Sequence, residues 1–246
     1  MDDLTIINGR VLLADGTVAE TALHLRDGHI AGFDGDMPGA NNTIDAKGKY
    51  VLPGIVDIHG DAFERQIMPR PGVHFALDIA LLDTDRQMLA NGITTAFHGV
   101  TFSWEPGLRS RENFVRIMDT VAALNGALKC DTRLHMRFET YNIDGADAVL
   151  EWTEQGRIGL LAFNNHTPEI YENTLNGTGL AKYAGRAGLS ESAYAALVER
   201  VIARAGEVPA VVEKLASAAG RAGIQQLSYD DAEPEMRTYY NDLGCR

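Results

Sequence analysis

From Tyr50 onward the chain repeats one pattern, a short apolar run followed by a longer segment with helical character. Strands that alternate with helices form parallel βαβ units, so the pattern predicts an α/β protein. Five such units fit either an open doubly wound sheet or most of a (β/α)8 barrel. The predicted strands cover residues 51–58, 93–98, 132–138, 158–163 and 224–228. The predicted helices cover residues 78–90, 111–127 and 145–155, with one long helix or a broken pair over 190–219.

Residues 1–50 have a different texture, with short alternating runs divided by turn residues. Asn8-Gly9 predicts a turn between two strands, and Asp27-Gly28 predicts the turn of a hairpin. So few short strands cannot bury a core alone. We therefore predict two parts, an N-terminal β-sandwich portion over 1–50 and a partial barrel over 51–246. His24 and His29, in the first part, are expected to be exposed.

Composition excludes several classes of protein. The net charge of −12 disfavours nucleic acid or an anionic membrane as a partner. No apolar run approaches the ~18 residues of a transmembrane helix, and the N-terminus lacks the apolar region of a secretory signal. Two cysteines, Cys130 and Cys245, give neither a disulfide framework nor a CxxC pair. A cytoplasmic protein is expected.

Polar residues at the strand ends favour the barrel over the open sheet. No glycine-rich phosphate motif follows the first strand, which argues against a dinucleotide-binding sheet. In a barrel the carboxyl ends of all strands converge on one face, where active sites are built. We therefore predict an incomplete (β/α)8 TIM-like barrel of about five βα units. The polar residues at these ends are His59, Asp61, His98, His135, Arg137, Glu139, Asn164, Asn165, His166, Tyr229, Asp230 and Asp231.

His59 and Asp61 are the first candidate metal ligands, because residues two apart on a strand share a face. Glu139 and His166 add a second carboxylate and a second imidazole. Together they suit a divalent metal ion such as Zn, Mn or Fe, although each alone could be a structural hydrogen-bonding group. Glu139 could also bridge two metals or act as a base, and with Asp230 it is a predicted catalytic carboxylate.

Some of the strand-end residues also have structural interpretations. Of Asp230 and Asp231, one is expected to point inward and the other to cap the next helix. His135, inside its strand, is interpreted as a buried, hydrogen-bonded residue of the barrel interior.

Arginines around the predicted metal face indicate a phosphorylated substrate. Guanidinium groups bind phosphate oxygens bidentately, and Arg65, Arg70 and Arg137 are the candidates. The alternative for each is a salt bridge with a nearby acidic residue such as Glu64 or Asp78.

Five segments resemble the PhnM family of phosphonate metabolism, within the amidohydrolase superfamily. They read VLPGIVDIHGD, MPRPGV, NGITTAFHGVT, DTRLHMRFE and LAFNNHTP. The resemblance implies hydrolysis of α-D-ribose 1-methylphosphonate 5-triphosphate, with loss of diphosphate, in the carbon–phosphorus lyase pathway. It implies that His59, Asp61 and His166 bind metal and that Glu139 binds or bridges it. The arginines would hold the phosphate chain of a small phosphorylated sugar.

The chain departs from that family in three places. Tyr229 stands where the family has a histidine, and Asn165 where it often has an aspartate. The resemblance also implies three further strands and a late aspartate, so the chain is expected to correspond to a C-terminally truncated member. Two alternatives stay open. One is a cyclic amidohydrolase or deacetylase, and the other is an inactive fragment that needs a complementary chain or a homo-oligomer.

Overall fold

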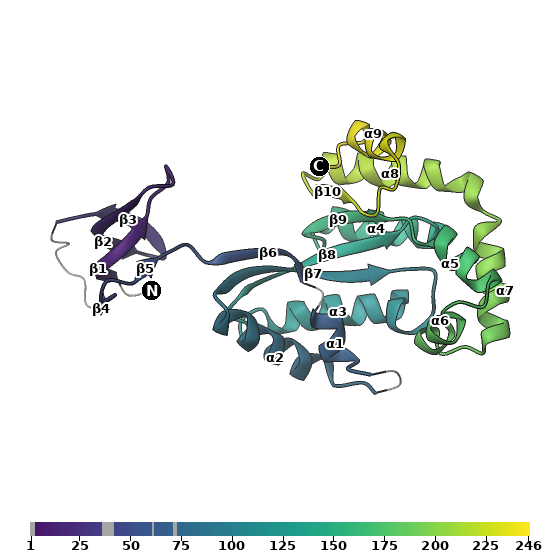
Figure 1. Ribbon diagram of the computed structural model, residues 1–246, viewed down its shortest axis with the longest axis horizontal. Coiled ribbons are helices and arrows are strands. Elements are labelled where there is room, and N and C mark those ends of the chain that lie inside the picture. Colours follow the sequence, from purple (N-terminus) through teal and green to yellow (C-terminus); the bar gives the residue numbers. More distant parts are fainter. Residues whose placement is uncertain (1–2, 36–41, 61, 71–72) are drawn as a thin grey trace. The chain divides into compact units, whose positions relative to one another are not determined.

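The computed structural model describes residues 3–35, 42–60, 62–70 and 73–246. The chain divides into two compact units, Met1–Gly54 and Ile55–Arg246, both visible in Figure 1.

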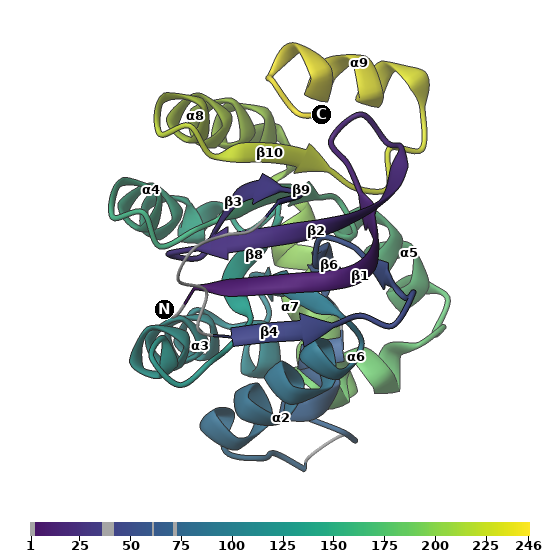
Figure 2. The ribbon, with the colours of Figure 1, turned by 90° about the vertical axis from the view of Figure 1, so that its left-hand side faces the viewer.

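The first unit is a five-stranded sheet. Its strand order is β3-β2-β1-β4 (Figure 2). The short strand β5 pairs with β1. Asp27 and Gly28 have φ angles of 51° and 79° and connect β2 to β3, as the hairpin prediction requires. The strands are β1 (Leu4–Leu12), β2 (Val18–Arg26), β3 (His29–Phe33), β4 (Asn42–Asp45) and β5 (Tyr50–Val51).

Two predictions for this unit were wrong. Asn8-Gly9 makes no turn, because β1 runs through it with an irregularity in its pairing to β2 between Ile6 and Gly9. Asn8 adopts φ 55° there, a conformation that asparagine tolerates, so the turn-like dipeptide marks a bulge. His24 is buried, since its Nδ1 lies 3.1 Å from Thr5 Oγ1 and its Nε2 3.0 Å from Gly35 O.

The second unit contains a parallel sheet with the order β10-β9-β8-β7-β6. Neighbours in the sheet are neighbours in sequence, as expected for consecutive units of a barrel. The predicted incomplete α/β barrel with an N-terminal β-portion is confirmed. The strands are β6 (Ile55–Gly60), β7 (Ile93–Phe102), β8 (Asp131–Glu139), β9 (Leu160–Asn164) and β10 (Gln225–Ser228).

The predicted segment over 190–219 is a broken pair of helices, with Pro209 in the first turn of the second helix. In the helix predicted over 78–90, Ala76 occupies the N-cap position and Asp78 lies in the first turn. The helices are α1 (Ala62–Ile67), α2 (Leu77–Ala90), α3 (Arg111–Leu124), α4 (Ala146–Glu154), α5 (Thr167–Leu175), α6 (Leu180–Ala187), α7 (Glu191–Ile202), α8 (Val208–Arg221) and α9 (Pro234–Asp242). Short 3-10 turns are η1 (Gly107–Arg109), η2 (Ile143–Gly145) and η3 (Ala205–Glu207).

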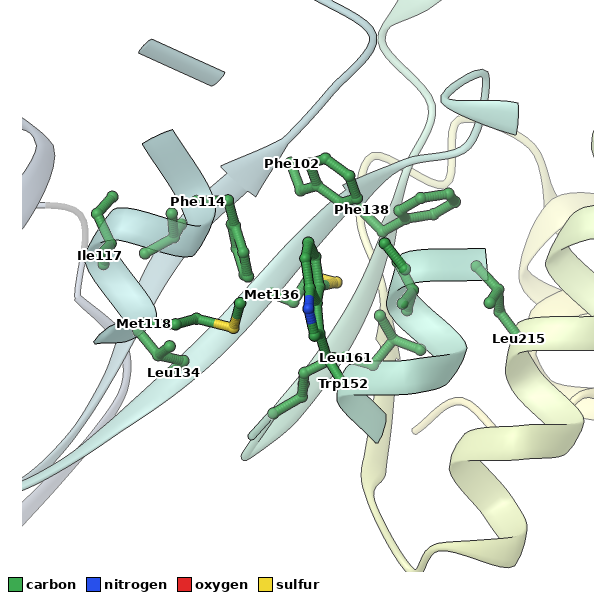
Figure 3. Close-up of a cluster of buried hydrophobic side chains, with 14 of the residues drawn as sticks. Phe102, Phe114, Ile117, Met118, Leu134, Met136, Phe138, Trp152, Leu161 and Leu215 are labelled. Atoms are coloured by element: carbon green, nitrogen blue, oxygen red, sulfur yellow. The ribbon is translucent and has the colours of Figure 1, made fainter. Parts of the chain in front are cut away.

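The main core lies between one face of this sheet and the helices that cover it. Phe102, Met136 and Phe138 from the strands meet Phe114 of α3 and Trp152 of α4 (Figure 3). Because side chains alternate across a strand, filling this face assigns the intervening residues of β8 to the opposite face.

The sheet ends in two edge strands, β6 and β10. In β6 the side chains of Ile55, Val56 and Ile58 are each more than half exposed. An edge strand with exposed apolar side chains can pair with further strands. Within the described ranges, no helix is long and apolar enough to cross a membrane.

Candidate active site

The candidate site is built from the inner face of β8 and from the carboxyl ends of neighbouring strands. Leu134, Met136 and Phe138 belong to the core or pack in it, so His135, Arg137 and Glu139 share the other face of β8. Beyond the strand ends lie α5, α6 and α7 (Figure 1).

A first group joins two histidines through a tyrosine. The Tyr229 hydroxyl lies 2.7 Å from His59 Nδ1 and 3.2 Å from His135 Nε2. His135 Nδ1 lies 2.8 Å from the carbonyl oxygen of Ile58, so that nitrogen carries the proton and donates it. His135 Nε2 then accepts from the Tyr229 hydroxyl, and His59 Nδ1 donates to the tyrosine oxygen. A neutral imidazole with the proton on Nδ1 carries its lone pair on Nε2, the form in which histidine binds metal.

A second group places His166 between two carboxylates. Glu139 Oε2 lies 3.2 Å from His166 Nδ1, and Asp230 Oδ2 lies 2.8 Å from His166 Nε2. Glu139 is almost fully buried, and its Oε1 accepts from the His166 and Thr167 backbone N–H groups and from the Thr167 hydroxyl. These N–H groups begin α5, whose dipole also favours a negative charge at this place.

The carboxylates favour the charged form of His166. The hydrogen bond to Glu139 raises the pKa of His166, and the negative charges of Glu139 and Asp230 raise it further. Burial and the charge of Arg137 act in the opposite direction. His166 therefore holds a proton more tightly than an exposed histidine does, and a metal ion at Nε2 would have to displace that proton.

The predicted substrate-binding arginines lie in different environments. The Arg137 guanidinium lies 5.5 Å from the centre of the Tyr229 ring, next to the first group. Arg65 on α1 and Arg70 just after it have exposed side chains. Asp61, the predicted partner of His59, falls outside the described residues.

Asp231 and His98 take structural positions. Asp231 Oδ2 accepts from Ser228 Oγ at 2.7 Å, and Glu233 is the N-cap residue of the following helix. The prediction that one of the two aspartates caps this helix was wrong. His98 is only 2% exposed and contacts the Phe63 ring on the core face of β7, so burial lowers the pKa of His98 to about 4. His135, which is fully buried, fits its predicted interior position.

Several contacts around Glu139 were not expected. Trp104 Nε1 donates to Thr167 Oγ1 at 2.9 Å, which links the loop after β7 to the Glu139 group. On the same loop Glu105 is buried and bonded to Arg186 and Tyr194. Arg186 lies in the sequence segment YAGRAGLSE, in which the spacing of the residues matches no ligand-binding motif.

The donor types fit a divalent metal ion, although the geometry is not that of a formed metal site. Among the described residues, no three histidine, cysteine, aspartate or glutamate side chains are placed to hold one ion. The 2.8 Å between His166 Nε2 and Asp230 Oδ2 is a hydrogen-bond distance. Two ligands of one tetrahedral ion lie about 3.3 Å apart at bond lengths of ~2.0 Å, so Asp230 has to move slightly for both to bind. Imidazole nitrogens and carboxylate oxygens remain the ligands that such ions use.

Comparisons with known proteins find similar sequences and structures among hydrolases. Alpha-D-ribose 1-methylphosphonate 5-triphosphate diphosphatase of Escherichia coli (strain K12) is 24% identical over 243 residues, 97% of this chain and 64% of that enzyme. An allantoinase of Bacillus licheniformis is 25% identical over 256 residues, 99% of this chain and 52% of that enzyme. A triazine hydrolase from Arthobacter aurescens has a similar structure, with a TM-score of 0.57 and 12% identity over 99% of this chain and 58% of its own. No family model matches the chain.

These relatives and the half-barrel support a hydrolase of the amidohydrolase superfamily. Within that class, the resemblance to the E. coli diphosphatase extends along nearly the whole chain, but the sequence identity is low. The chain spans between half and two thirds of the length of the curated relatives described here.

Proposed function

We propose that this chain forms part of a metal-dependent hydrolase that cleaves the phosphoric anhydride of a sugar triphosphate, as the name of its E. coli relative describes. The observation that carries the proposal is the meeting of two groups, His59–Tyr229–His135 and Glu139–His166–Asp230, at the carboxyl ends of β6, β8, β9 and β10. Arg137 lies beside both, since it is close to the Tyr229 ring and its charge acts on His166.

In this proposal His59, His166 and Glu139 would hold the ion, with Asp61 as a further ligand predicted from the sequence. A bound divalent ion supplies a Lewis acid that polarises a phosphoryl oxygen and lowers the pKa of water. The ions proposed for this site are Zn, Mn or Fe.

The chain's own residues have separate roles. Tyr229 orients His59 so that Nε2 carries the lone pair. Glu139 holds the start of α5 through two hydrogen bonds with His166 and two with Thr167, and Glu139 itself is almost fully buried. Asp230 is well exposed beside His166, so it is placed to accept the proton of the attacking water.

The partner we propose is a polypeptide segment, in this chain or another, that supplies further βα units. β6 and β10 are the edges of the sheet, and three more parallel strands would close an eight-stranded barrel between them. A second copy of the chain is the alternative partner for these edges.

The test is an assay for diphosphate release from alpha-D-ribose 1-methylphosphonate 5-triphosphate with Mn²⁺ or Zn²⁺. The purified chain is assayed alone and mixed with the segment of the E. coli enzyme that extends beyond the aligned region. We expect release in the mixture and a loss of at least about 100-fold in the Asp230→Asn variant. A mixture that assembles and binds metal, yet releases no diphosphate, would contradict the proposal.

A second candidate is hydrolysis of a cyclic amide, favoured by the allantoinase that aligns with 99% of this chain. Such a substrate has no phosphate chain and needs no arginine. Assaying allantoin under the same conditions separates the two functions, since turnover of allantoin without release of diphosphate selects the second.

A further inference from the structure

A buried group of charged residues lies on the loop that follows β7. Glu105 is 2% exposed, and its Oε1 accepts from Arg186 Nη2 at 2.5 Å and from the Tyr194 hydroxyl. Arg186 comes from α6 and Tyr194 from α7, so one carboxylate joins the loop to two helices. None of these residues has a role in the hydrolytic chemistry described above.

Arg109 ends the same loop and lies close to this group. The Ser103 N–H donates to the carbonyl oxygen of Arg109 at 2.9 Å, which folds η1 back against the end of β7. A Cβ atom at Gly107 would lie 2.9 Å from the carbonyl oxygen of Arg186, and Gly107 has φ 78°. Only glycine fits both the conformation and the close approach, so the loop is held tightly against α6.

Arg109 lies among other charged side chains. Burial lowers the pKa of Arg109, the charges of Arg186 and Arg137 lower it further, and Glu64 and Glu105 raise it. The guanidinium groups of Arg109 and Arg186 therefore lie close enough for one charge to act on the other. The Arg109–Glu64 ion pair spans 3.8 Å, too long for a hydrogen bond.

Two arginines of this region also have hydrogen-bond donors without a partner among the described residues. Within the described part of the chain, the buried Nε atoms of Arg109 and Arg186 have no hydrogen-bond partner. The two side chains as a whole keep 20% and 15% of their surface exposed, so neither arginine is fully enclosed. Buried donors that lack partners are costly unless something else accepts from them.

The region continues into the candidate site. Trp104, next to Glu105, donates to Thr167, and Thr167 donates to Glu139. Arg137, whose charge acts on Arg109, lies beside Tyr229. The positive charges therefore extend from the His59–Tyr229 group towards Arg109 and Arg186.

We propose that Arg109 and Arg186, with Arg137 between them and the hydrolytic groups, bind the diphosphate portion of the substrate. The inference rests on the proposed function in that it assumes a phosphoric anhydride substrate. It differs from the expectation drawn from the sequence, because it assigns the distal phosphates to Arg109 and Arg186 in place of Arg65 and Arg70.

The test measures binding of inorganic diphosphate to the purified chain by calorimetry at low ionic strength. We expect Arg109→Gln to weaken binding at least tenfold, since among the described residues this side chain makes only the long ion pair with Glu64. Arg204→Gln is the matched control, because Arg204 makes exposed ion pairs with Asp144 and Glu207, and we expect its affinity to stay within twofold. Arg65→Gln, expected to behave like this control, tests the assignment drawn from the sequence.

A second variant separates binding from folding. Arg186→Gln leaves Glu105 buried without its partner and can destabilise the fold, whereas Glu105→Gln removes one negative charge. We expect Glu105→Gln to tighten diphosphate binding several-fold, a result that a purely structural role for the cluster does not give. Absence of diphosphate binding, or equal affinity in wild type, Arg109→Gln and Glu105→Gln, would overturn the inference.

The measurement of diphosphate binding and the hydrolase assay test the two proposals separately. Arginine-dependent diphosphate binding without hydrolysis of the triphosphate supports this inference and counts against the proposed function. Hydrolysis with a KM unchanged in Arg109→Gln supports the function and overturns the inference.

Discussion

His59 and Tyr229, 170 residues apart in the sequence, are joined by a hydrogen bond of 2.7 Å between Nδ1 and Oη. His59 lies at the end of β6 and Tyr229 directly follows β10, the two edge strands of a five-stranded sheet. In a flat sheet with a strand spacing of ~4.8 Å these strands would lie about 19 Å apart. The bond therefore exists only because the sheet curls as a barrel does.

Replacing Tyr229 by phenylalanine tests the importance of this hydroxyl. Tyr229→Phe leaves His59 and His135 without a shared partner, so we expect the free energy of unfolding to fall by about 1–2 kcal/mol in urea denaturation. Tyr239→Phe is the matched control, because the buried Tyr239 hydroxyl has no hydrogen-bond partner among the described residues. Equal losses in both variants would mean that the hydroxyl bridge is not stabilising.

The contact of Glu139 with His166 predicts a change in titration. Glu139→Gln removes the hydrogen-bonding carboxylate that raises the pKa of His166, so we expect that pKa to fall in an NMR titration. Asp230→Asn should have a smaller effect, because Asp230 is exposed and contributes less to the shift. A pKa raised by folding gives stability that is complete below pH 6.5 and is lost as the pH rises through the folded-state value. Glu139→Gln should therefore flatten the dependence of stability on pH in that range.

The strands β7, β8 and β9 could be predicted from the sequence because each carries buried apolar side chains. The grouping of polar residues at their carboxyl ends followed from the parallel order alone. The curvature did not, since no local pattern encodes how far β6 lies from β10. For this reason the sequence indicated that His59 and Tyr229 face the same end, but not that they touch.

The failures have local causes. The dipeptide Asn8-Gly9 is compatible with a β-bulge as well as with a turn. The pairing of β1 with β2 determines that it forms a bulge. His24 is buried by hydrogen bonds to groups that are distant in sequence. Arg109 and Arg186 were not selected because a guanidinium pairs with an acid on most surfaces, and only the packing of the loop against α6 shows that these two are partly buried together.

His98 predicts acid sensitivity. Its pKa of about 4 lies below the ordinary value of 6.5, so the unfolded chain binds a proton between these pH values and the folded chain does not. Stability from this group is therefore complete above pH 6.5 and lost as the pH falls towards 4. Each pH unit in this window costs about 1.4 kcal/mol, so we expect a loss of about 2 kcal/mol between pH 6.5 and 5.

The measurement is the free energy of unfolding of wild type and His98→Gln as a function of pH. The variant should lose less stability on acidification, and His74→Gln, at an exposed histidine, should follow wild type. Parallel curves for wild type and His98→Gln would show that burial of His98 does not control the acid response.

The exposed edge of β6 predicts self-association. Val56 is 57% exposed on a strand with an unpaired side, and a charged residue at such a place opposes pairing between copies. We expect Val56→Lys to lower the apparent mass in sedimentation at high concentration, with the circular dichroism spectrum unchanged. Leu175→Lys is the control, since Leu175 is 63% exposed but ends the helix α5. The same decrease for both variants would indicate general solubility in place of edge pairing.

Tyr229 also limits metal binding. A phenol has an ordinary pKa of about 10, so it competes poorly with imidazole as a ligand at neutral pH. We expect the purified chain to bind at most one equivalent of Zn²⁺ or Mn²⁺, weakly, in calorimetry. Tyr229→His should raise the affinity, because it places a third imidazole next to His59 and His135. It should not by itself produce diphosphate release, since the open edges of β6 and β10 leave the barrel mouth incomplete. Rapid, metal-dependent release of diphosphate by either form alone would show that the five-stranded half-barrel already contains a sufficient site.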